Sequence, residues 1–416
     1  MKLSKFKIER NGEVFSYDNR VNSILDANGN PIGKESGLKP HPPVFHKSES
    51  PSTIKVILGH ACNYSCSYCL QKDIGDPSER AKNIMTRELI KKIRTHLDLS
   101  NVARIELWGG ETLLYWPDII EIISALDREG ITWYIPTNGT ILKMKHAEFF
   151  KHLKGKVTIG ISHDGPGHTS LRGPEFIARK VNEFHALQEA GVDFSFNCVI
   201  STTNYDLFKI NDYFQVFLHF NQLKPVPIVY ELGRTYETGA CATESHVITK
   251  EQIPAYRKIL KAYLKRHLEE FKKPPKDAFE RLLPTSLFHF GNGVIPYAKS
   301  MYEQSPIHHY SNCGADHPGL ITLDMNGALR VCQNTNEDYI YGTVSNIKEA
   351  KVQKVDYNKN DFCSDCSVLR LCNRSCPLEL PFETFLINHQ IENAHYTEIQ
   401  LSAFELLFES PISKIG

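Results

Sequence analysis

Three cysteines crowd into eight positions of the stretch HACNYSCSYCLQ, residues 60 to 71. Cys62, Cys66 and Cys69 have the spacing C-x3-C-x2-C, whereas a disulfide framework needs pairs of thiols. A zinc ion takes four ligands, and His60 is the nearby candidate for the fourth, so a zinc site stays open as an alternative. Three thiolates that bind three irons of a 4Fe–4S cube would leave the fourth iron free for a substrate or a cofactor. The spacing favours this second interpretation.

Six further cysteines lie between residues 313 and 376. They are Cys313, Cys332, Cys363, Cys366, Cys372 and Cys376. The last four have the spacing C-x2-C-x5-C-x3-C, which is also compatible with a structural zinc ribbon. Two cysteines stand apart from both groups. Cys198 lies in an apolar run and is predicted to pack in the core. Cys241 lies in a turn-rich segment, where it is either a loop thiol with no role, which is favoured, or a ligand near the substrate.

Polar and glycine residues recur where the predicted strands end. They include Gly109, Gly110 and Glu111 in WGGET, Thr137 and Asn138 in TNG, and Ser162 and Asp164 in SHDGP. A Gly-Gly pair lets a ligand approach the backbone, and a glutamate can hold an ammonium group, although GGE alone is more typical of a plain turn. The carboxyl ends of parallel strands meet at one edge of a sheet. Together these residues therefore predict a polar, ligand-sized bowl beside the cysteine triplet.

Six units of a strand followed by a helix position these residues. The predicted strands are 53–59, 104–109, 132–139, 157–162, 193–201 and 223–231. The first helix is predicted to begin at Thr86 as N-cap, and the second to end at Gly130. This alternation predicts an α/β fold, a parallel sheet with helices outside, curled into a partial or complete (β/α)6 TIM-like barrel. The triplet then follows strand one, at the end where such folds carry their active sites.

Asn-Gly dipeptides between alternating segments predict hairpins in the regions that flank the barrel. The predicted hairpin turns are Asn11-Gly12, Asn28-Gly29 and Asn326-Gly327. The first 50 residues therefore predict a short β-rich extension, and the segment LITLDMNGALRVC predicts a further hairpin that ends in a cysteine.

Composition excludes several classes of function. The chain has 416 residues, which predicts about two to three structural units or a large barrel with an appendage. It carries 48 basic and 48 acidic residues, which gives no reason to propose binding of nucleic acid or of a membrane surface. No apolar run approaches the roughly 18 residues of a membrane helix, and the N-terminal stretch lacks a secretory signal. A cytoplasmic location is therefore expected, where cysteine clusters indicate metal binding or catalysis.

The motif C-x3-C-x-Tyr-C after strand one, with GGE after strand two, resembles the radical S-adenosylmethionine (SAM) enzymes. The resemblance covers residues 53 to about 232. It implies that Cys62, Cys66 and Cys69 bind three irons of a 4Fe–4S cluster and that SAM chelates the fourth iron. One electron then splits SAM to methionine and a 5′-deoxyadenosyl radical, which abstracts a hydrogen from the substrate.

The same resemblance implies a set of contacts to SAM. By it, Gly109, Gly110 and Glu111 bind the methionyl amino group, Tyr68 contacts the adenine, Ser162 the ribose and Arg172 the carboxylate, and Val199 or Ile200 packs on the adenine. Thr137, Asn138 and Asp164 complete the expected cofactor-binding residues. The loop between Ser162 and Arg172 is shorter than is usual in the family. No catalytic base is identified.

The second cysteine group resembles the SPASM extension of radical enzymes, which in its full form holds two auxiliary 4Fe–4S clusters. The resemblance assigns Cys363, Cys366 and Cys372 to the outer cluster and Cys313, Cys332 and Cys376 to the inner one. The closing cysteine and an extra cysteine found in some members are missing here, so each cluster has three thiolates. The fourth ligand could be a substrate thiolate, water, or a residue such as His389 or His395. Alternatively, a cluster is absent or has fewer irons.

One departure from the family narrows the expected reaction. Sulfatase-maturating relatives have an aspartate base at the position of Gln333, and an amide cannot accept a proton at neutral pH. Formylglycine formation is therefore disfavoured. The expected function is an oxidoreductase-type maturase that modifies a peptide or protein side chain, for example by a thioether or carbon–carbon cross-link. The expected partners are that substrate and a reductant such as flavodoxin or ferredoxin.

Two alternatives remain, a radical SAM dehydrogenase that acts on a small molecule and a zinc-binding interaction protein without chemistry. The expected organisation is an extension at 1–50, a radical SAM partial barrel at 51–235, a helical link at 236–311 and a SPASM-type domain at 312–416. The first 50 residues are too few for the winged-helix peptide-recognition domain that many peptide-modifying relatives carry.

Overall fold

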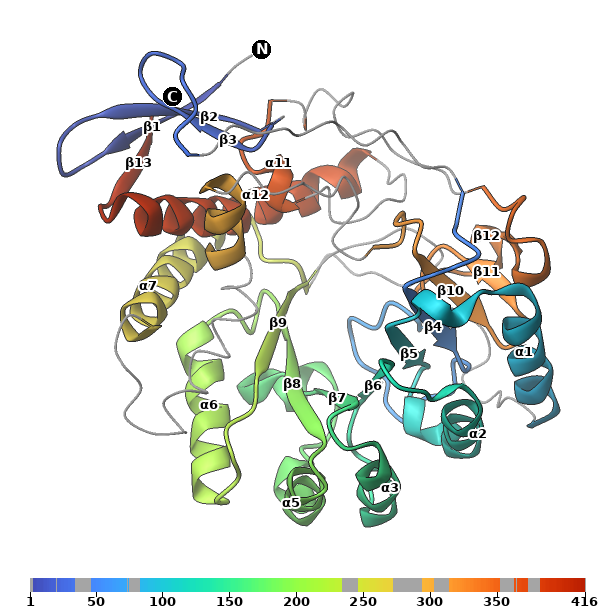
Figure 1. Cartoon of the computed structure of the whole chain (residues 1–416). Helices are drawn as coiled ribbons and strands as arrows, with labels where there is room; N and C mark the ends of the chain where they lie inside the picture. The colour runs from blue at the N-terminus through green and yellow to red at the C-terminus, as the bar shows by residue number, and fades with distance from the viewer. Residues whose placement is uncertain are drawn as a thin grey trace.

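A curved sheet with six adjacent parallel strands forms the centre of the computed structural model (Figure 1). The structure describes residues 3–19, 21–33, 46–72, 74, 83–233, 246–271, 294–302, 314–351, 363, 365–372 and 382–415. The six strands are β4 (Thr53–Ile57), β5 (Arg104–Trp108), β6 (Thr132–Thr137), β7 (Val157–Ser162), β8 (Asp193–Ile200) and β9 (Ile228–Leu232). Each pairs in parallel with the next, in the order of the sequence. The predicted α/β fold with a partial (β/α)6 barrel is confirmed.

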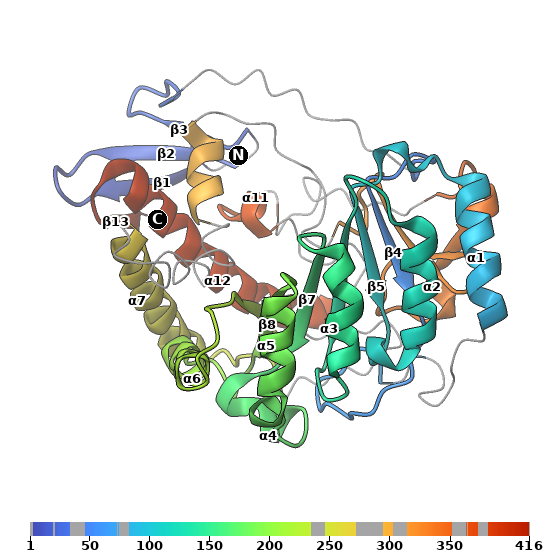
Figure 2. The ribbon, with the colours of Figure 1, turned by 60° about the horizontal axis from the view of Figure 1, so that its bottom comes forward.

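Helices follow the strands and cover the outer face of the sheet. They are α1 (Asn83–His96), α2 (Trp116–Leu126), α3 (Met144–Phe150), α4 (His168–Leu171), α5 (Val181–Glu189), α6 (Leu207–Phe220) and α7 (Ile253–Phe271). Short 3-10 turns lie at Leu99–Asn101, Thr112–Tyr115, Lys151–Leu153, Gly165–Gly167, Ile177–Lys180, Glu337–Tyr339 and Val344–Asn346. Figure 2 shows α1, α2, α3 and α5 side by side along one face of the sheet. Among the described residues, no helix combines the length and the apolar character that a membrane span requires.

Alternation along the strands separates the two faces of the sheet. On β8, Phe194, Phe196 and Cys198 are buried against the helices, while Ser195 and Asn197 point to the inner face. Because successive side chains of a strand point to opposite faces, the buried set packs the core and the polar set lines the barrel interior. The prediction that Cys198 is a packed core residue is confirmed, since it is fully buried.

A charged cluster lies on the inner face of β4 and β5. The Glu106 carboxylate lies 3.5 Å from Lys55 Nζ and accepts hydrogen bonds from Arg104 Nε at 2.7 Å and from Trp108 Nε1 at 2.9 Å. Burial opposes ionisation of Glu106, but Lys55, Trp108 and Arg104 together lower its pKa below the usual value. The interior of the barrel is therefore polar and carries both signs of charge.

One helix and one strand begin at residues other than the predicted ones. α1 begins at Asn83, so Thr86 is not its N-cap; its buried hydroxyl donates a hydrogen bond to Asp118 of α2. The strand predicted at 223–231 begins at Ile228, because Pro225 and Pro227 lack the N–H that a sheet ladder needs.

The predicted Asn326-Gly327 hairpin extends the barrel sheet beyond its first strand. β10 (Leu320–Asp324) pairs in parallel with β4, and β11 (Ala328–Arg330) and β12 (Ile340–Thr343) follow it in antiparallel order. Gly327 has a φ of 80°, which the turn requires and which glycine adopts without strain. The hairpin that leads to Cys332 is thus built onto the barrel sheet.

A second sheet joins the two ends of the described chain. It contains β1 (Ser4–Ile8), β2 (Val14–Asp18), β3 (Ser23–Leu25) and β13 (Ile412–Ile415) in the order β13-β1-β2-β3. The predicted turn at Gly12 is present, with a φ of 76°. This sheet packs on the long helix α12 (Phe382–Phe408), beside the short helix α11 (Leu369–Cys372) (Figure 1). The ring of Phe404 lies 4.8 Å from that of Phe6 and 5.1 Å from that of Phe15.

We expect Phe404→Ala to lower the free energy of unfolding by about 3–5 kcal/mol, because it removes a fully buried ring from this aromatic cluster. The matched control is Phe220→Ala, which removes a ring that is 82% exposed on α6 and should change stability by less than about 0.5 kcal/mol. Urea unfolding followed by circular dichroism measures both. Equal midpoints for the two variants would contradict the packing described here.

Candidate functional site

The cysteine triplet lies in the loop that follows β4, at the carboxyl end of the sheet. Cys62, Cys66 and Cys69 are all half-buried. The N–H of Cys69 donates to the carbonyl of Cys66 at 3.2 Å, and the N–H of Tyr64 donates to Cys62 Sγ at 3.4 Å. Among the described residues, no three His, Cys, Asp or Glu side chains converge to hold a single metal ion. A 4Fe–4S cube makes a different demand, because each thiolate binds its own iron.

Burial controls the protonation of these thiols. It raises the pKa of Cys66 to about 11, opposed by Arg172, while the neighbouring thiols Cys69 and Cys62 raise it further. Burial also raises the pKa of Cys62, where the N–H of Tyr64 opposes the rise. Cys62 and Cys66 are therefore neutral at pH 7 in the metal-free chain. Metal ligation deprotonates a thiol outright, so a cationic cluster suits this donor set.

The GGE segment packs directly on the backbone that enters the triplet loop. The N–H of Gly110 donates to the carbonyl of Gly59 at 3.0 Å, and the N–H of Glu111 donates to that of Ala61 at 2.8 Å. A Cβ at Gly110 would lie 2.4 Å from the His60 carbonyl oxygen and 2.5 Å from that of Ala61. Position 110 therefore requires glycine because two strands of backbone touch there.

Glu111 is fully buried and already has three hydrogen-bond donors. Its Oε1 accepts from the Leu113 N–H at 2.9 Å and from Thr137 Oγ1 at 2.6 Å, and its Oε2 accepts from the Asn138 N–H at 2.6 Å. Burial raises the pKa of Glu111, and these hydrogen bonds oppose the rise. The carboxylate therefore fixes the ends of β5 and β6 to each other. Contact of the GGE segment with an amino group stays a prediction.

Asn138 extends this network into the triplet loop. Its Nδ2 donates to Asn63 Oδ1 at 2.7 Å, and Asn63 Nδ2 donates to Thr140 Oγ1 at 2.7 Å. Asn63 directly follows Cys62, so the end of β6 restrains the first cysteine of the triplet.

Asp164, at the end of β7, contacts three of the other residues predicted to bind the cofactor. Its Oδ2 accepts hydrogen bonds from the Tyr68 hydroxyl and, at 3.0 Å, from Arg172 Nε. Its Oδ1 accepts from the Val199 N–H at 2.9 Å. The Arg172 guanidinium also lies 5.2 Å from the centre of the Tyr68 ring. The structure thus brings Tyr68, Asp164, Arg172 and Val199 together from three different segments.

The other residues predicted at the strand ends lie on opposite faces of the sheet. Ser162 and Val199 are half-buried at inner-face positions of β7 and β8. Ile200 has the opposite orientation and is 1% exposed in the core. Of the two alternatives Val199 and Ile200, the strand pleat leaves Val199 as the one on the inner face of the sheet, where the ligand site is predicted.

A buried histidine network beneath this cluster was missed by the sequence analysis. His163 Nδ1 accepts from the Gly165 N–H at 3.0 Å, so the proton lies on Nε2, which donates to Glu175 Oε1 at 2.9 Å. Tyr213 donates to the same carboxylate at 2.8 Å, and His168 stacks on His163 at 4.0 Å. Burial lowers the pKa of His168 to about 4, so it is neutral. These contacts support the segment from Asp164 to Arg172. The sequence alone does not show that Glu175 pairs with His163 and Tyr213, because the three residues lie 12 and 38 positions apart.

The described part of the second cysteine group lies in two places. Cys332 follows β11, and its Sγ accepts from the Asn334 N–H at 3.3 Å. The carbonyl of Gln333 accepts from Gln71 Nε2 at 3.0 Å, which ties this segment to the triplet loop. Cys363 packs with Leu369 and Phe385, beside the half-buried Cys366. Cys313 and Cys376, like the isolated Cys241, lie outside the described residues.

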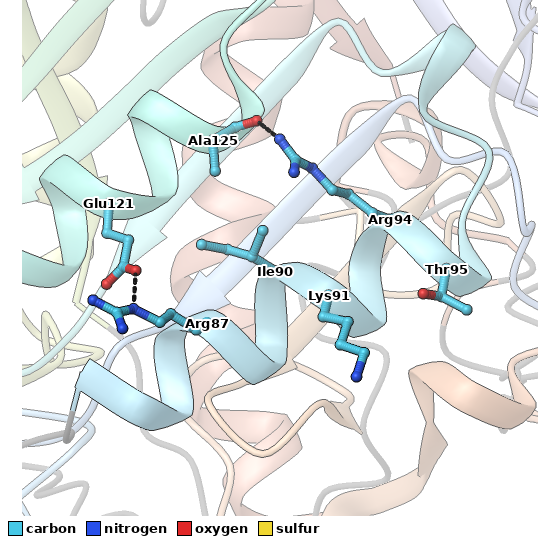
Figure 3. Close-up of a pocket in the computed structure, with 7 residues that line it drawn as sticks. All are labelled: Arg87, Ile90, Lys91, Arg94, Thr95, Glu121 and Ala125. Atoms are coloured by element: carbon cyan, nitrogen blue, oxygen red, sulfur yellow. Dashed lines mark hydrogen bonds and ion pairs between the residues drawn. The ribbon is translucent and has the colours of Figure 1, made fainter.

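A separate surface hollow of about 330 Å³ lies between α1 and α2 (Figure 3). Arg87 Nε donates to Glu121 Oε1 at 2.8 Å across it, and Arg94 donates to the carbonyl of Ala125. It sits on the outer, helical face of the sheet and contains none of the predicted site residues.

Comparison with known sequences finds similarity over the strands whose ends carry these residues. Residues 56–208 match the sequence profile of the Radical SAM superfamily. Over 352 residues the chain is 24% identical to the Radical SAM cyclopropyl synthase TigE of Paramaledivibacter caminithermalis, covering 79% of this chain and 68% of that protein. The resemblance to radical SAM enzymes that the motifs indicated is confirmed.

Solved structures share the fold of the chain. One is native anSMEcpe with bound AdoMet and the Cp18Cys peptide, with 17% identity and a TM-score of 0.60 over 86% of this chain and 98% of that one. Another is Streptococcus suis SuiB bound to the precursor peptide SuiA, with 13% identity and a TM-score of 0.51 over 79% of this chain and 72% of that one. At these identities the likeness shows the fold alone.

We expect Gly110→Ala to destabilise the chain by about 1–3 kcal/mol and to lower the iron bound per chain, because the new Cβ collides with the backbone of the triplet loop. The matched control is Gly109→Ala, whose Cβ would find its nearest neighbour at 3.3 Å. Urea unfolding and iron analysis after anaerobic reconstitution check both. A Gly110→Ala protein as stable and as iron-rich as the control would contradict this account.

In the iron-free chain, we expect alkylation of Cys66 by iodoacetamide to accelerate about tenfold per pH unit from pH 8 to 10, because its pKa is raised to about 11. In the urea-unfolded chain the rate should level off once the pH exceeds the ordinary thiol pKa of about 8.5. Mass spectrometry of the proteolysed chain measures the rate at this position. A plateau below pH 9 in the folded chain would refute the raised pKa.

Proposed function

We propose, on the premise that residues 56–208 form a radical SAM domain, that the chain is a maturase that modifies a side chain of a peptide or protein. The observation that carries the SAM site is the Asp164 cluster, which fastens the triplet loop through Tyr68 to the ends of β7 and β8. The modification we propose is a thioether or a carbon–carbon cross-link.

In this proposal Cys62, Cys66 and Cys69 hold three irons of a 4Fe–4S cluster. That cluster supplies the electron that splits SAM and so starts hydrogen abstraction from the substrate. The protein residues position the reactants. Asp164 orients Tyr68 and Arg172 toward one side of the triplet, and Glu111 holds the ends of β5 and β6 at the other.

The other residues that we propose to contact SAM also lie at strand ends. The backbone of Gly109 and Gly110, the side chain of Ser162 and the half-buried Val199 lie at strand ends around the triplet loop, where they would contact SAM. Thr137 and Asn138 act through Glu111 and Asn63, so we assign them to positioning of the site. Exclusion of water from a radical site also needs such close packing of the loops.

Two observations support a peptide or protein as the substrate class. The solved structures with this fold include one with the Cp18Cys peptide and one with the precursor peptide SuiA. The likeness to these two extends over most of this chain and is not confined to residues 56–208. The small-molecule alternative would use the same SAM site and differ in what fills the barrel interior.

We propose the domain organisation inferred from the sequence, with the SAM barrel at 51–235 and a SPASM-type domain at 312–416. In it Cys363, Cys366 and Cys372 hold an outer auxiliary cluster and Cys332, with Cys313 and Cys376, an inner one. The contact between Gln333 and Gln71 supports a position of the inner cluster beside the SAM site. Gln333 offers no carboxylate base there, which favours cross-linking over formylglycine formation.

Cys313, Cys332 and Cys376 would hold the inner cluster, which would supply a Lewis-acidic iron that lowers the pKa of a substrate thiol. The proposal also includes a flavodoxin- or ferredoxin-type reductant and a cytoplasmic location, where thiols stay reduced.

We expect replacement of Cys62, Cys66 and Cys69 by Ala to abolish reductive cleavage of SAM, because the open-iron cluster loses all three of its ligands. The control is Cys241→Ala, which removes a thiol outside both motifs and should keep full activity. Chromatography of 5′-deoxyadenosine after anaerobic reduction with dithionite measures cleavage. Production of 5′-deoxyadenosine by the triple variant would show that the triplet is not the SAM site.

The substrate class is tested by co-expression with short Cys-containing peptides encoded beside the gene for this chain. We expect a peptide product two hydrogens lighter whose cysteine no longer alkylates, as a thioether requires. Mass spectrometry before and after thiol alkylation distinguishes the outcomes. A lighter product whose cysteine still alkylates would favour a carbon–carbon link. Unchanged peptides would count against the proposed substrate class, and a consumed small molecule would then support the alternative.

A further inference from the structure

The outer cysteine group is packed against the first half of α12. Cys363 and Cys372 are 4% and 7% exposed, and Cys366 is half-buried between them in the sequence. Phe385 of α12 packs with Cys363, and the N–H of Cys366 donates to the carbonyl of Cys363 at 3.1 Å. Three thiols of one short motif thus face the same helix.

Two consecutive residues of α12 contact two of these sulfurs. Glu392 Oε2 accepts from Cys372 Sγ at a distance of 3.7 Å, and Asn393 Nδ2 donates to Cys366 Sγ at 3.4 Å. Glu392 is 6% exposed, so its carboxylate lies in the interior beside the thiols. A carboxylate oxygen is an iron-binding group, and an interior carboxylate is stabilised when it coordinates a metal.

The two histidines considered from the sequence have other contacts. His395 Nδ1 shares a hydrogen bond with the Tyr256 hydroxyl at 2.7 Å, and the two rings stack at 6.1 Å. His389 stacks on Phe385 at 5.3 Å. Glu392 thus places a carboxylate oxygen in direct contact with a sulfur of this motif.

We propose that Glu392 is the fourth iron ligand of the outer auxiliary cluster, where the SPASM pattern of this chain lacks its closing cysteine. This inference rests on the auxiliary cluster in the proposed function. Cys363, Cys366 and Cys372 supply the three thiolates, and Asn393 donates its hydrogen bond to a ligating sulfur, which tunes the reduction potential. The outer cluster is then closed to substrate sulfur, and an open iron for a substrate thiolate belongs to the inner cluster.

The test uses the full chain with Cys62, Cys66 and Cys69 replaced by Ala, so that the iron measured belongs to the auxiliary clusters. In this parent, E392Q should bind about one iron fewer per chain, because a cube with three protein ligands loses its unprotected iron on oxidation. E392C should restore the iron content, since it supplies a thiolate at the same position. Q390A, an exposed residue of the same helix, serves as the control and should match the parent.

Iron and sulfide analysis, Mössbauer spectroscopy and circular dichroism measure the four proteins after anaerobic reconstitution and a brief oxidation with ferricyanide, which releases an iron that has no protein ligand. The proposal is overturned if E392Q keeps the iron content and the Mössbauer spectrum of the parent. It is also overturned if E392Q and E392C lose iron equally while both keep their helix content, because the loss would then reflect packing. A parent without iron and sulfide would overturn the auxiliary cluster itself, whereas an iron-loaded parent with an unchanged E392Q overturns only the ligand.

Discussion

The candidate site depends on one buried carboxylate. Asp164 is fully buried, so its charge has no water to stabilise it and must be satisfied by the protein. The groups that satisfy it are the Tyr68 hydroxyl, the Arg172 guanidinium and the Val199 N–H. Because Tyr68 stands between Cys66 and Cys69, the electrostatic requirement of Asp164 fixes where the thiols lie relative to β7 and β8. Loss of a partner of such a buried charge typically costs about 3–5 kcal/mol.

Much of this arrangement could be predicted from local sequence. The strand at Val157–Ser162 and the Asn326-Gly327 hairpin follow from alternation and turn chemistry, which act over a few residues. The pairing of β10 with β4 could not, because the sequence of an apolar strand does not specify which distant strand it will pair with. Glu111 illustrates the same limit. Its residue type suggested a ligand contact, whereas two of the three donors that occupy its oxygens come from Thr137 and Asn138 at the end of β6.

The helix α12 connects regions that the sequence presents as separate. Its Phe404 packs against Phe6 of the second sheet, which contains β1 and β13. Its Gln400 Nε2 donates to the carbonyl of Ser367, which lies within the outer cysteine motif, at 2.8 Å. Glu398 pairs with Arg257 of α7 at 2.6 Å. These contacts along the whole helix hold Glu392 rigidly against the sulfurs. A metal ligand needs such support from the secondary-structure element that carries it.

The pairing of β1 with β13 also sets the order in which the protein can be completed during synthesis. Lys5 lies opposite Ile415, so the first strand of the small sheet is made long before its edge partner. At about 5–20 residues per second, a ribosome needs on the order of 20–80 s to cover that interval. Throughout it the apolar faces of Phe6 and Phe15 lack the cover that α12 later provides. The nascent chain must therefore remain protected from aggregation during that interval, and the triplet loop emerges well before α12, so metal loading and closure of the fold can be separate events in time.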